Sequence, residues 1–309
     1  MIHSENQGMI NVLGYNLFYE IFEPKDGTSK GTVLTLAGGP GCPHQYILPM
    51  SDLTNAGYRV IFYDQLGIGK SEMPKNKYMF CIEYNVEEVE ALRVAMNLGK
   101  INLWGSSYGG ALAIAYALKY QRNLKSLITA GGLASIPLTV EGMNKWKAEL
   151  PPEIIAVLNK YESVGDFENP EYINAMMVFY HRYVCRLPEW PEEFVYTNDN
   201  ISKPVYHLMN GPNEYTIIGN LKYWDVTDQL PTIKVPTLVT GGRYDEVSPK
   251  VAESLHRGIK GSKRLTFENS AHTPFWDERE KYVQAVAKFL DQVNVPKIRS
   301  KKVSKKRKK

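Results

Sequence analysis

The chain has 309 residues, of which 43% are hydrophobic and 23% are charged. This balance is that of a soluble globular protein with a sizeable core, and no apolar stretch approaches the roughly 18 residues that suggest a membrane helix. The N-terminal stretch MIHSENQGMI has neither the basic start nor the apolar run of a signal peptide. Cys42, Cys81 and Cys185 are too far apart to form a CxxC zinc or redox pair. We therefore expect a cytoplasmic protein without a membrane segment.

The net charge of +4 comes from the C-terminal end of the chain. The last fourteen residues, PKIRSKKVSKKRKK, contain nine Lys and Arg residues and no acid. Outside this segment 28 basic residues stand against 33 acidic ones, so we expect no nucleic acid partner. Residues 296–309 are predicted to form a basic disordered tail, which serves either as a solvated end or as a weak tether to an anionic surface.

The first half of the chain alternates between strand-like and helix-like segments. Apolar runs that end in glycine are typical of buried parallel strands, and apolar residues at helical intervals are typical of amphipathic helices. In chain order these patterns predict two short strands in 9–23, a strand at 32–39, a helix at 44–57, a strand at 58–67, a helix at 83–99, a strand at 101–105, a helix from 107 and a strand at 124–132.

Residues 134–230 interrupt this alternation with many aromatic residues and prolines, and they indicate a mostly helical insertion. The regular pattern then returns with a strand at 232–242, a helix near 248–258, a strand at 262–270 and a helix near 277–292. We therefore predict an α/β fold with a mostly parallel sheet covered by helices. Its core would span 1–133 and 231–295, with a helical cap at 134–230 inserted after the sixth strand.

The segment Gly105-Ser106-Ser107-Tyr108-Gly109 fits the pattern G-x-S-x-G and lies between a predicted strand and a predicted helix. This context is that of a nucleophile elbow, in which a sharp turn exposes the serine and bulky neighbours two places away would collide. The helix that follows points its N-terminus at the site and favours developing negative charge. Ser107 is therefore the candidate nucleophile.

A serine hydroxyl needs a base, and an elbow of this kind predicts an acid and then a histidine later in the chain. Asp245 follows the strand PTLVTGG, and His272 follows the strand RLTFE. Ligand chemistry in open α/β sheets gathers at the carboxyl ends of strands, so Ser107, Asp245 and His272 are expected to meet there as a catalytic triad. For the oxyanion, the candidate donors are the backbone N–H of Tyr108 and a glycine-loop N–H at Gly38.

The motifs GGPG (38–41), DQLGIGKSE (64–72), WGSSYGG (104–110) and GGRYDE (241–246), together with GPNE (211–214), resemble those of the proline iminopeptidases of the α/β-hydrolase fold. Among these, the chain is most similar to the archaeal tricorn-interacting aminopeptidase. The resemblance runs from about residue 8 to residue 291.

This resemblance implies a serine aminopeptidase that releases the N-terminal residue, proline or another mainly apolar one, from short peptides without a metal or cofactor. It also implies that Glu214 and Glu246 bind the free amine of the substrate, which charge-assisted hydrogen bonds would favour. Association with a larger protease follows from the resemblance alone. The family usually has histidine before GGPG, whereas this chain has Ala37, so the support of the oxyanion loop is in question.

Two other functions stay open at this point. A carboxylesterase or lactonase of the same fold would use the same triad but would need no amine recognition. A catalytically inactive binding protein of this fold is the second alternative, which Ala37 keeps open. The preferred N-terminal residue depends on the shape of the cap pocket, which the sequence does not give.

Overall fold

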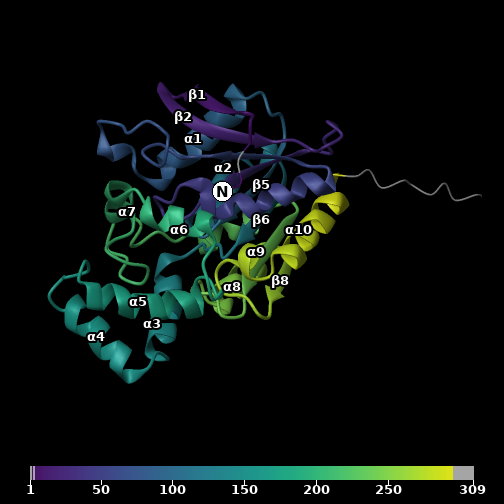
Figure 1. The fold of residues 1–309 in the computed structure, drawn as a ribbon. Coiled ribbons are helices and arrows are strands. Elements are labelled where there is room, and N and C mark those ends of the chain that lie inside the picture. Colours follow the sequence, from purple (N-terminus) through teal and green to yellow (C-terminus); the bar gives the residue numbers. More distant parts are fainter. Residues whose placement is uncertain (1, 3, 295–309) are drawn as a thin grey trace, which may run out of the picture.

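The computed structural model describes residue 2 and residues 4–294, and an eight-stranded sheet forms its centre (Figure 1). The order across the sheet is β1-β2-β4-β3-β5-β6-β7-β8, and every neighbouring pair from β4 to β8 is parallel. β2 pairs antiparallel with both β1 and β4. The prediction of a mostly parallel sheet is therefore confirmed. The strands are β1 (Gln7–Val12), β2 (Tyr15–Phe22), β3 (Thr32–Leu36), β4 (Arg59–Tyr63), β5 (Ile101–Ser106), β6 (Leu124–Ala130), β7 (Thr237–Gly242) and β8 (Lys263–Phe267).

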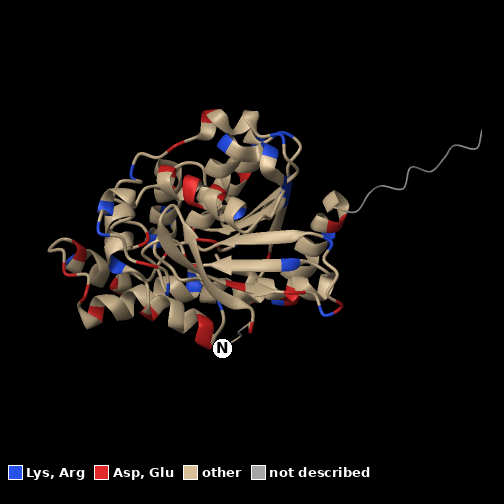
Figure 2. Ribbon diagram, turned by 90° about the horizontal axis from the view of Figure 1, so that it is seen from above, with Lys and Arg blue, Asp and Glu red and all other residues tan. Residues whose placement is uncertain are grey.

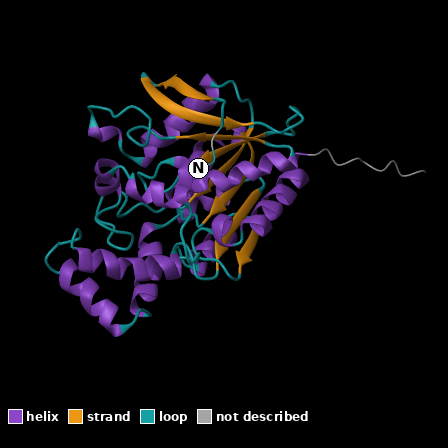
Figure 3. Ribbon diagram, in the orientation of Figure 1, coloured by secondary structure: helices purple, strands orange, loops and turns teal. Residues whose placement is uncertain are grey.

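Helices cover both faces of the sheet (Figure 3). Side chains alternate between the two faces of a strand, so Leu103 of β5 joins one apolar cluster and Trp104 joins the other. The first cluster contains residues of α1 (Ile82–Ala95), α2 (Tyr108–Tyr120) and α8 (Pro249–Gly258). The second contains residues of the 3₁₀ helix η1 (His44–Ala56), α9 (Pro274–Asp277) and α10 (Arg279–Asn294). The predicted covering of the sheet by helices is therefore confirmed.

The helix predicted at 44–57 exists, but η1 is a 3₁₀ helix rather than an α-helix. Pro49 lies inside it, and a proline cannot donate the backbone hydrogen bond that continues an α-helix. The segment ends at Gly57, which has a φ of 86° and so adopts a left-handed conformation that suits glycine. Three shorter 3₁₀ helices complete the set of such elements in the described chain: η2 (Lys77–Met79), η3 (Gln121–Asn123) and η4 (Thr227–Thr232).

Five helices follow β6 before the chain returns to the sheet at β7. They are α3 (Ile136–Ala148), α4 (Pro152–Glu162), α5 (Pro170–Tyr183), α6 (Glu192–Asp199) and α7 (Lys203–Met209). In Figure 1, α3, α4 and α5 form a lobe beside the sheet, whereas α6 and α7 lie nearer to it. A single β-bridge between Ser135 and Asp225 joins the two ends of this insertion. The predicted boundaries at residues 134 and 230 stay a prediction.

Charge is spread over the described chain rather than gathered on one side. Figure 2 shows Lys and Arg residues interspersed with Asp and Glu residues over strands, helices and loops. The predicted basic tail at 296–309 lies outside the described residues. Within the described part, no helix is both long enough and apolar enough to cross a membrane.

Candidate active site

Ser107 occupies a sharp turn between β5, which ends at Ser106, and α2, which begins at Tyr108. Its φ of 56° and ψ of −124° are sparsely populated for residues other than glycine. Because α2 starts directly after Ser107, the unpaired N–H groups of the first helical turn lie beside the serine. The strand–turn–helix context predicted for the G-x-S-x-G pattern is thus present.

The two glycines of this pattern are required by close packing. A Cβ atom on Gly105 would lie 2.0 Å from the carbonyl oxygen of Gly109, and a Cβ atom on Gly109 would lie 2.2 Å from the carbonyl oxygen of Leu36. No side chain fits at either position unless β3, β5 and α2 move apart. The glycines therefore let the helix approach the sheet closely enough to hold the serine in its turn.

Asp245 and His272 follow β7 and β8 and lie together at the same edge of the sheet. Nδ1 of His272 is 2.6 Å from Oδ1 of Asp245, and both side chains are buried. The same carboxylate oxygen accepts the backbone N–H of Val247 at 2.8 Å. On the other side, a Cβ atom on Gly131 would lie 2.5 Å from the imidazole ring, so the backbone after β6 packs directly against it. The aspartate thus holds the proton on Nδ1 and leaves Nε2 for other chemistry.

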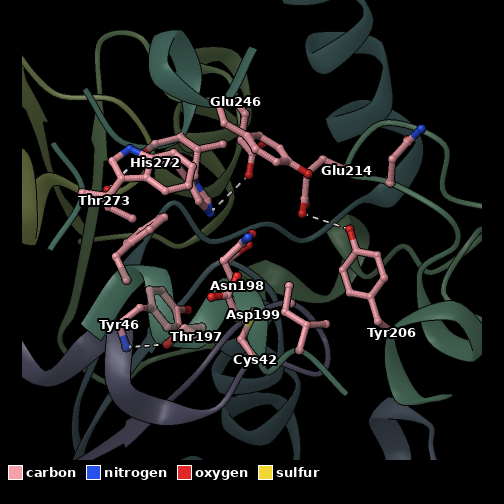
Figure 4. A pocket seen from close by; sticks show the side chains of 18 of the residues that line it. Cys42, Tyr46, Thr197, Asn198, Asp199, Tyr206, Glu214, Glu246, His272 and Thr273 are labelled. Atoms are coloured by element: carbon pink, nitrogen blue, oxygen red, sulfur yellow. Dashed lines mark hydrogen bonds and ion pairs between the residues drawn. The ribbon is translucent and has the colours of Figure 1, made fainter. Parts of the chain in front are cut away.

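Ser107 and His272 line one cavity of about 260 Å³. Nε2 of His272 makes no hydrogen bond to any described residue, and it lies 3.7 Å from Oε1 of Glu246 (Figure 4). The predicted triad is therefore hydrogen-bonded between Asp245 and His272 but not between His272 and Ser107. Contacts of this second kind are often long before substrate binds and shorten in the complex.

Glu214 and Glu246 line the same cavity as the serine and the histidine. Glu214 comes from the loop after α7, and its Oε1 accepts a hydrogen bond from the Tyr206 hydroxyl at 2.9 Å (Figure 4). Glu246 is 2% exposed, and its Oε2 accepts no hydrogen bond from a described residue. The two carboxylates that the resemblance assigns to amine binding thus share a cavity with the candidate catalytic residues.

The charges in this cavity act strongly on one another. Burial raises the pKa of both glutamates, and the charge of Glu214 raises the pKa of Glu246 further. Burial alone would lower the pKa of His272, but Asp245 first and then Glu246 and Glu214 raise it to about 9. These shifts have a common cause, since carboxylates that are close together and shielded from water need a positive partner. The cavity therefore favours a cationic group.

The backbone N–H groups near Ser107 differ in their availability for an oxyanion. Tyr108 is the first residue of α2, so no carbonyl of that helix accepts its N–H. The N–H of Gly38 donates to the Tyr46 hydroxyl at 2.7 Å. Gly39 lines the cavity with Ser107, and its N–H has no hydrogen-bond acceptor among the described residues. The Gly38 N–H is therefore engaged by Tyr46, and its role as an oxyanion donor stays a prediction.

The loop that carries these glycines is supported although Ala37 offers no polar side chain. The Ala37 carbonyl accepts a hydrogen bond from Nε2 of Gln65 at 3.1 Å. The Gly38 carbonyl accepts the N–H of Cys42 at 3.2 Å, and the Gly38 N–H reaches the Tyr46 hydroxyl. Partners from outside the loop therefore hold it in place of a side chain at position 37.

Several cavity residues had no signal in the sequence. The lining includes five aromatic side chains, which come from η1, from α5 to α7 and from the segment between α5 and α6. The richness of residues 134–230 in aromatics was visible, but the side chains that face the cavity depend on how the helices pack. The aromatic residues of the lining are Tyr46, Tyr180, Trp190, Phe194 and Tyr206. Over residue 2 and residues 4–294, no cluster of three or more His, Cys, Asp and Glu side chains is placed to hold a metal ion.

Comparison with known proteins agrees with this geometry. Residues 31–279 match a family model described as the alpha/beta hydrolase fold. The chain is 47% identical over 289 residues to a proline iminopeptidase of Saccharolobus solfataricus, with 93% of each chain covered. It is 43% identical over 286 residues to a proline iminopeptidase of Thermoplasma volcanium, with 92% of this chain and 96% of the relative covered.

A solved structure points the same way. The crystal structure of a proline iminopeptidase of Mycobacterium smegmatis matches with a TM-score of 0.87 and 30% identity, over 94% of this chain and 99% of the other. The match thus extends over nearly the whole of both chains, insertion included. The chain described here belongs to the proline iminopeptidase family of the α/β hydrolases.

Proposed function

We propose that this protein is a serine aminopeptidase that releases the N-terminal residue of short peptides through an acyl-enzyme. The observation that carries the proposal is the presence of Glu214 and Glu246 in the cavity lined by Ser107 and His272. A peptide that begins with a free amine offers a cation at a fixed distance from its first carbonyl. Carboxylates beside the nucleophile would therefore bind the amine and set the first peptide bond at the serine.

In this proposal each residue of the triad has one role. His272 takes the proton of Ser107 as the serine oxygen attacks the carbonyl, and Asp245 orients the imidazole and stabilises the imidazolium. His272 then protonates the leaving amine, and water repeats the cycle on the acyl-enzyme. The strained turn at Ser107 and the 2.6 Å hydrogen bond between His272 and Asp245 support these roles.

The oxyanion would be held by the backbone N–H groups of Tyr108 and Gly39. Such donors are typically worth about 3–4 kcal/mol each in serine proteases. Gly39 replaces Gly38 in this role because the Gly38 N–H already donates to Tyr46.

The substrate class follows from the cavity walls. Aromatic side chains such as Tyr180 and Tyr206 line the cavity together with the carboxylates and favour proline and other mainly apolar residues at the cleaved position. The helices of the insertion supply part of the lining, which favours short peptides over folded chains. An esterase or lactonase would leave Glu214 and Glu246 without a task, and an inactive binding protein would need no strained serine.

Location and partners complete the proposal. Cys42, Cys81 and Cys185 are free thiols, in keeping with a reducing cytoplasm. The resemblance of the motifs supports an association with a larger protease that would deliver peptides to this enzyme. Co-purification of such a protease with this chain from its native cells would test that association.

The decisive experiment compares aminoacyl-aminomethylcoumarins with their N-acetylated forms. We expect prolyl and other apolar aminoacyl substrates to be cleaved at least about a hundredfold faster than the acetylated ones, because acetylation removes the cation. Glu214→Gln should reduce kcat/KM for the free-amine substrates and should not reduce it for a small neutral ester. Equal cleavage of free and acetylated substrates would exclude an aminopeptidase.

A further inference from the structure

The imidazole of His272 lies between two carboxylates and not between a carboxylate and the serine. Asp245 is hydrogen-bonded to Nδ1 at 2.6 Å, and Oε1 of Glu246 lies 3.7 Å from Nε2. Figure 4 shows Nε2 directed at the Glu246 carboxylate, with Glu214 beyond it. The nitrogen that has to accept the serine proton therefore faces a glutamate carboxyl group of the cavity wall.

This arrangement favours a proton on His272 when no substrate is bound. Three carboxylates, those of Asp245, Glu246 and Glu214, act on one buried imidazole. Among the described residues, no Lys or Arg is paired with any of the three. Their combined charge raises the pKa of His272 to about 9. A histidine that is protonated at neutral pH does not serve as a general base.

The other groups that face the cavity do not change this balance near neutral pH. Burial raises the pKa of the Cys42 thiol and of the Tyr180 and Tyr206 hydroxyls, and the glutamate charges raise it further, so these groups stay neutral. On the lining supplied by α7, the ammonium of Lys203 is paired with Glu168 at 3.0 Å. Burial likewise raises the pKa of the Tyr46 hydroxyl, in η1. Asp199, at the end of α6, and His207, in α7, are the remaining titratable side chains of the lining.

We propose that the N-terminal ammonium of the substrate activates the enzyme by replacing the imidazolium of His272 as the cationic partner of Glu246. This inference rests on the proposed aminopeptidase function. The ammonium donates to Glu246 and Glu214, and His272 releases the proton on Nε2 to solvent. Nε2 is then a neutral acceptor in the cavity that Ser107 also lines, and it takes the serine proton as the carbonyl is attacked. One proton leaves the site for each cation that enters, so the charge of the site is conserved.

The proposal gives Glu246 a second task besides holding the amine. As long as the acyl group carries its ammonium, Glu246 stays paired and His272 stays neutral, so the effect covers both acylation and deacylation. A substrate without the cation, such as an ester or an acetylated peptide, leaves His272 protonated. Such a substrate is turned over only where the pH itself is high enough to deprotonate the histidine.

The test measures kcat against pH for a prolyl-aminomethylcoumarin and for a neutral p-nitrophenyl ester, since kcat reports the pKa of the base in the enzyme–substrate complex. For the wild-type protein we expect the basic form to appear at a pH at least about one unit lower with the prolyl substrate than with the ester. Coincident profiles for the two substrates would overturn the proposal.

Glu246→Gln separates this role from simple amine binding. Removing a charge at this distance should lower the pKa of His272 by roughly 1–3 units, so ester hydrolysis near pH 7 should rise about tenfold or more. Prolyl-aminomethylcoumarin cleavage should fall in the same variant. If Glu246 only binds the amine, the ester profile stays where the wild type has it, and if it is only structural, both activities fall together.

Glu214→Gln is the matched comparison, since Glu214 acts on His272 less than Glu246 does. It should reduce cleavage of the prolyl substrate, and it should shift the pH profile of ester hydrolysis less than Glu246→Gln does. Should the prolyl substrate show no advantage over the acetylated one in the wild type, the proposed function fails. If the prolyl substrate is cleaved faster than the acetylated one but the ester profiles are unchanged in both variants, the aminopeptidase function stands and activation by the ammonium fails.

A direct measurement does not depend on the Glu246 variant. In Ser107→Ala, which keeps the cavity charges and does not turn substrate over, ¹⁵N spectra distinguish imidazolium from neutral imidazole at His272. At pH 7 we expect imidazolium in the free protein and neutral imidazole with a bound prolyl dipeptide. An acetylated dipeptide should leave the imidazolium in place. A His272 that is already neutral in the free protein would overturn the proposal.

Discussion

Two buried histidines of this molecule lie between carboxylates, yet only one of them borders the cavity. At His44, Asp64 is 2.8 Å from Nδ1 and Glu20 is 3.1 Å from Nε2. At His272, Asp245 is 2.6 Å from Nδ1, but the carboxylate that faces Nε2 is 3.7 Å away. The first histidine is hydrogen-bonded at both nitrogens, whereas the second is hydrogen-bonded at only one.

Access, and not ionisation, separates the two sites. Burial opposes protonation at both, and the neighbouring carboxylates nonetheless raise the pKa of each histidine to about 9. The His44 ring packs near Phe18 and Phe62, with centroids 5.8 and 6.1 Å away, and it does not line the cavity that contains Ser107. A histidine between carboxylates is thus part of the framework when both nitrogens are bonded. It is a candidate base when one nitrogen opens onto a nucleophile.

The largest expected effect is on catalysis. His272→Ala should lower kcat/KM for a prolyl-aminomethylcoumarin by roughly 10⁴-fold or more, since the base and the proton donor are both lost. His44→Gln, assayed at a temperature where it is folded, should keep kcat within about tenfold of the wild type. Circular dichroism confirms folding in each case. A folded His44→Gln protein as inactive as His272→Ala would erase the distinction between the two sites.

The loss of stability should be larger at His44 than at His272, which is the reverse of the order expected for catalysis. His44→Ala removes the cation from two enclosed carboxylates, Asp64 and Glu20, and should reduce the free energy of unfolding by about 3–5 kcal/mol. His272→Ala should reduce it by less, because only one carboxylate, that of Asp245, is hydrogen-bonded to His272, and this carboxylate also accepts the N–H of Val247. Urea unfolding of both variants measures the difference. An equal loss in both would mean that the second carboxylate hydrogen bond of His44 adds no stability.

The sequence predicted the part of the site that depends on local pattern. Ser107, Asp245 and His272 each follow a predicted strand, and parallel strands bring their carboxyl ends to one edge, so these residues lie together at that edge. Their catalytic roles remain proposals.

What the sequence could not give depends on contacts between distant segments. The Gly38 N–H is occupied because Tyr46 of η1 reaches it, and no pattern in the loop signals this. The same holds for His44, whose partners Glu20 and Asp64 come from β2 and from the residue after β4. The strand order in the sheet brings these carboxylates to one histidine, and the order of residues along the chain does not show this contact.

The dependence of stability on pH gives a smaller effect. The pKa of each histidine is raised above the value of about 6.5 in the unfolded chain. Their contribution to stability is therefore fully present below about pH 6.5, and it is lost as the pH rises through about 9. For His44 the loss should be up to about 3 kcal/mol.

Urea unfolding at pH 6 and pH 9.5 compares the wild type with two variants. His44→Gln should lose less stability between these two pH values than the wild type. His272→Ala should still show the part of the pH-dependent loss that comes from His44. A decline that is the same in all three proteins would place its origin elsewhere.

The smallest predicted effect concerns Tyr46, which lies two residues after His44 in η1 but reaches the oxyanion loop. Tyr46→Phe leaves the N–H of Gly38 without an acceptor, which should lower the free energy of unfolding by about 1–3 kcal/mol. The backbone of Tyr46 stays fixed, because its N–H donates to Thr197 at 3.0 Å and its carbonyl accepts from Trp276 at 2.6 Å. Only the loop should therefore shift, and kcat should fall about tenfold with KM nearly unchanged. An unchanged kcat would mean that Gln65 and Cys42 hold the loop without the tyrosine. In that case both His44 and Tyr46 of η1 would contribute to stability and not to catalysis.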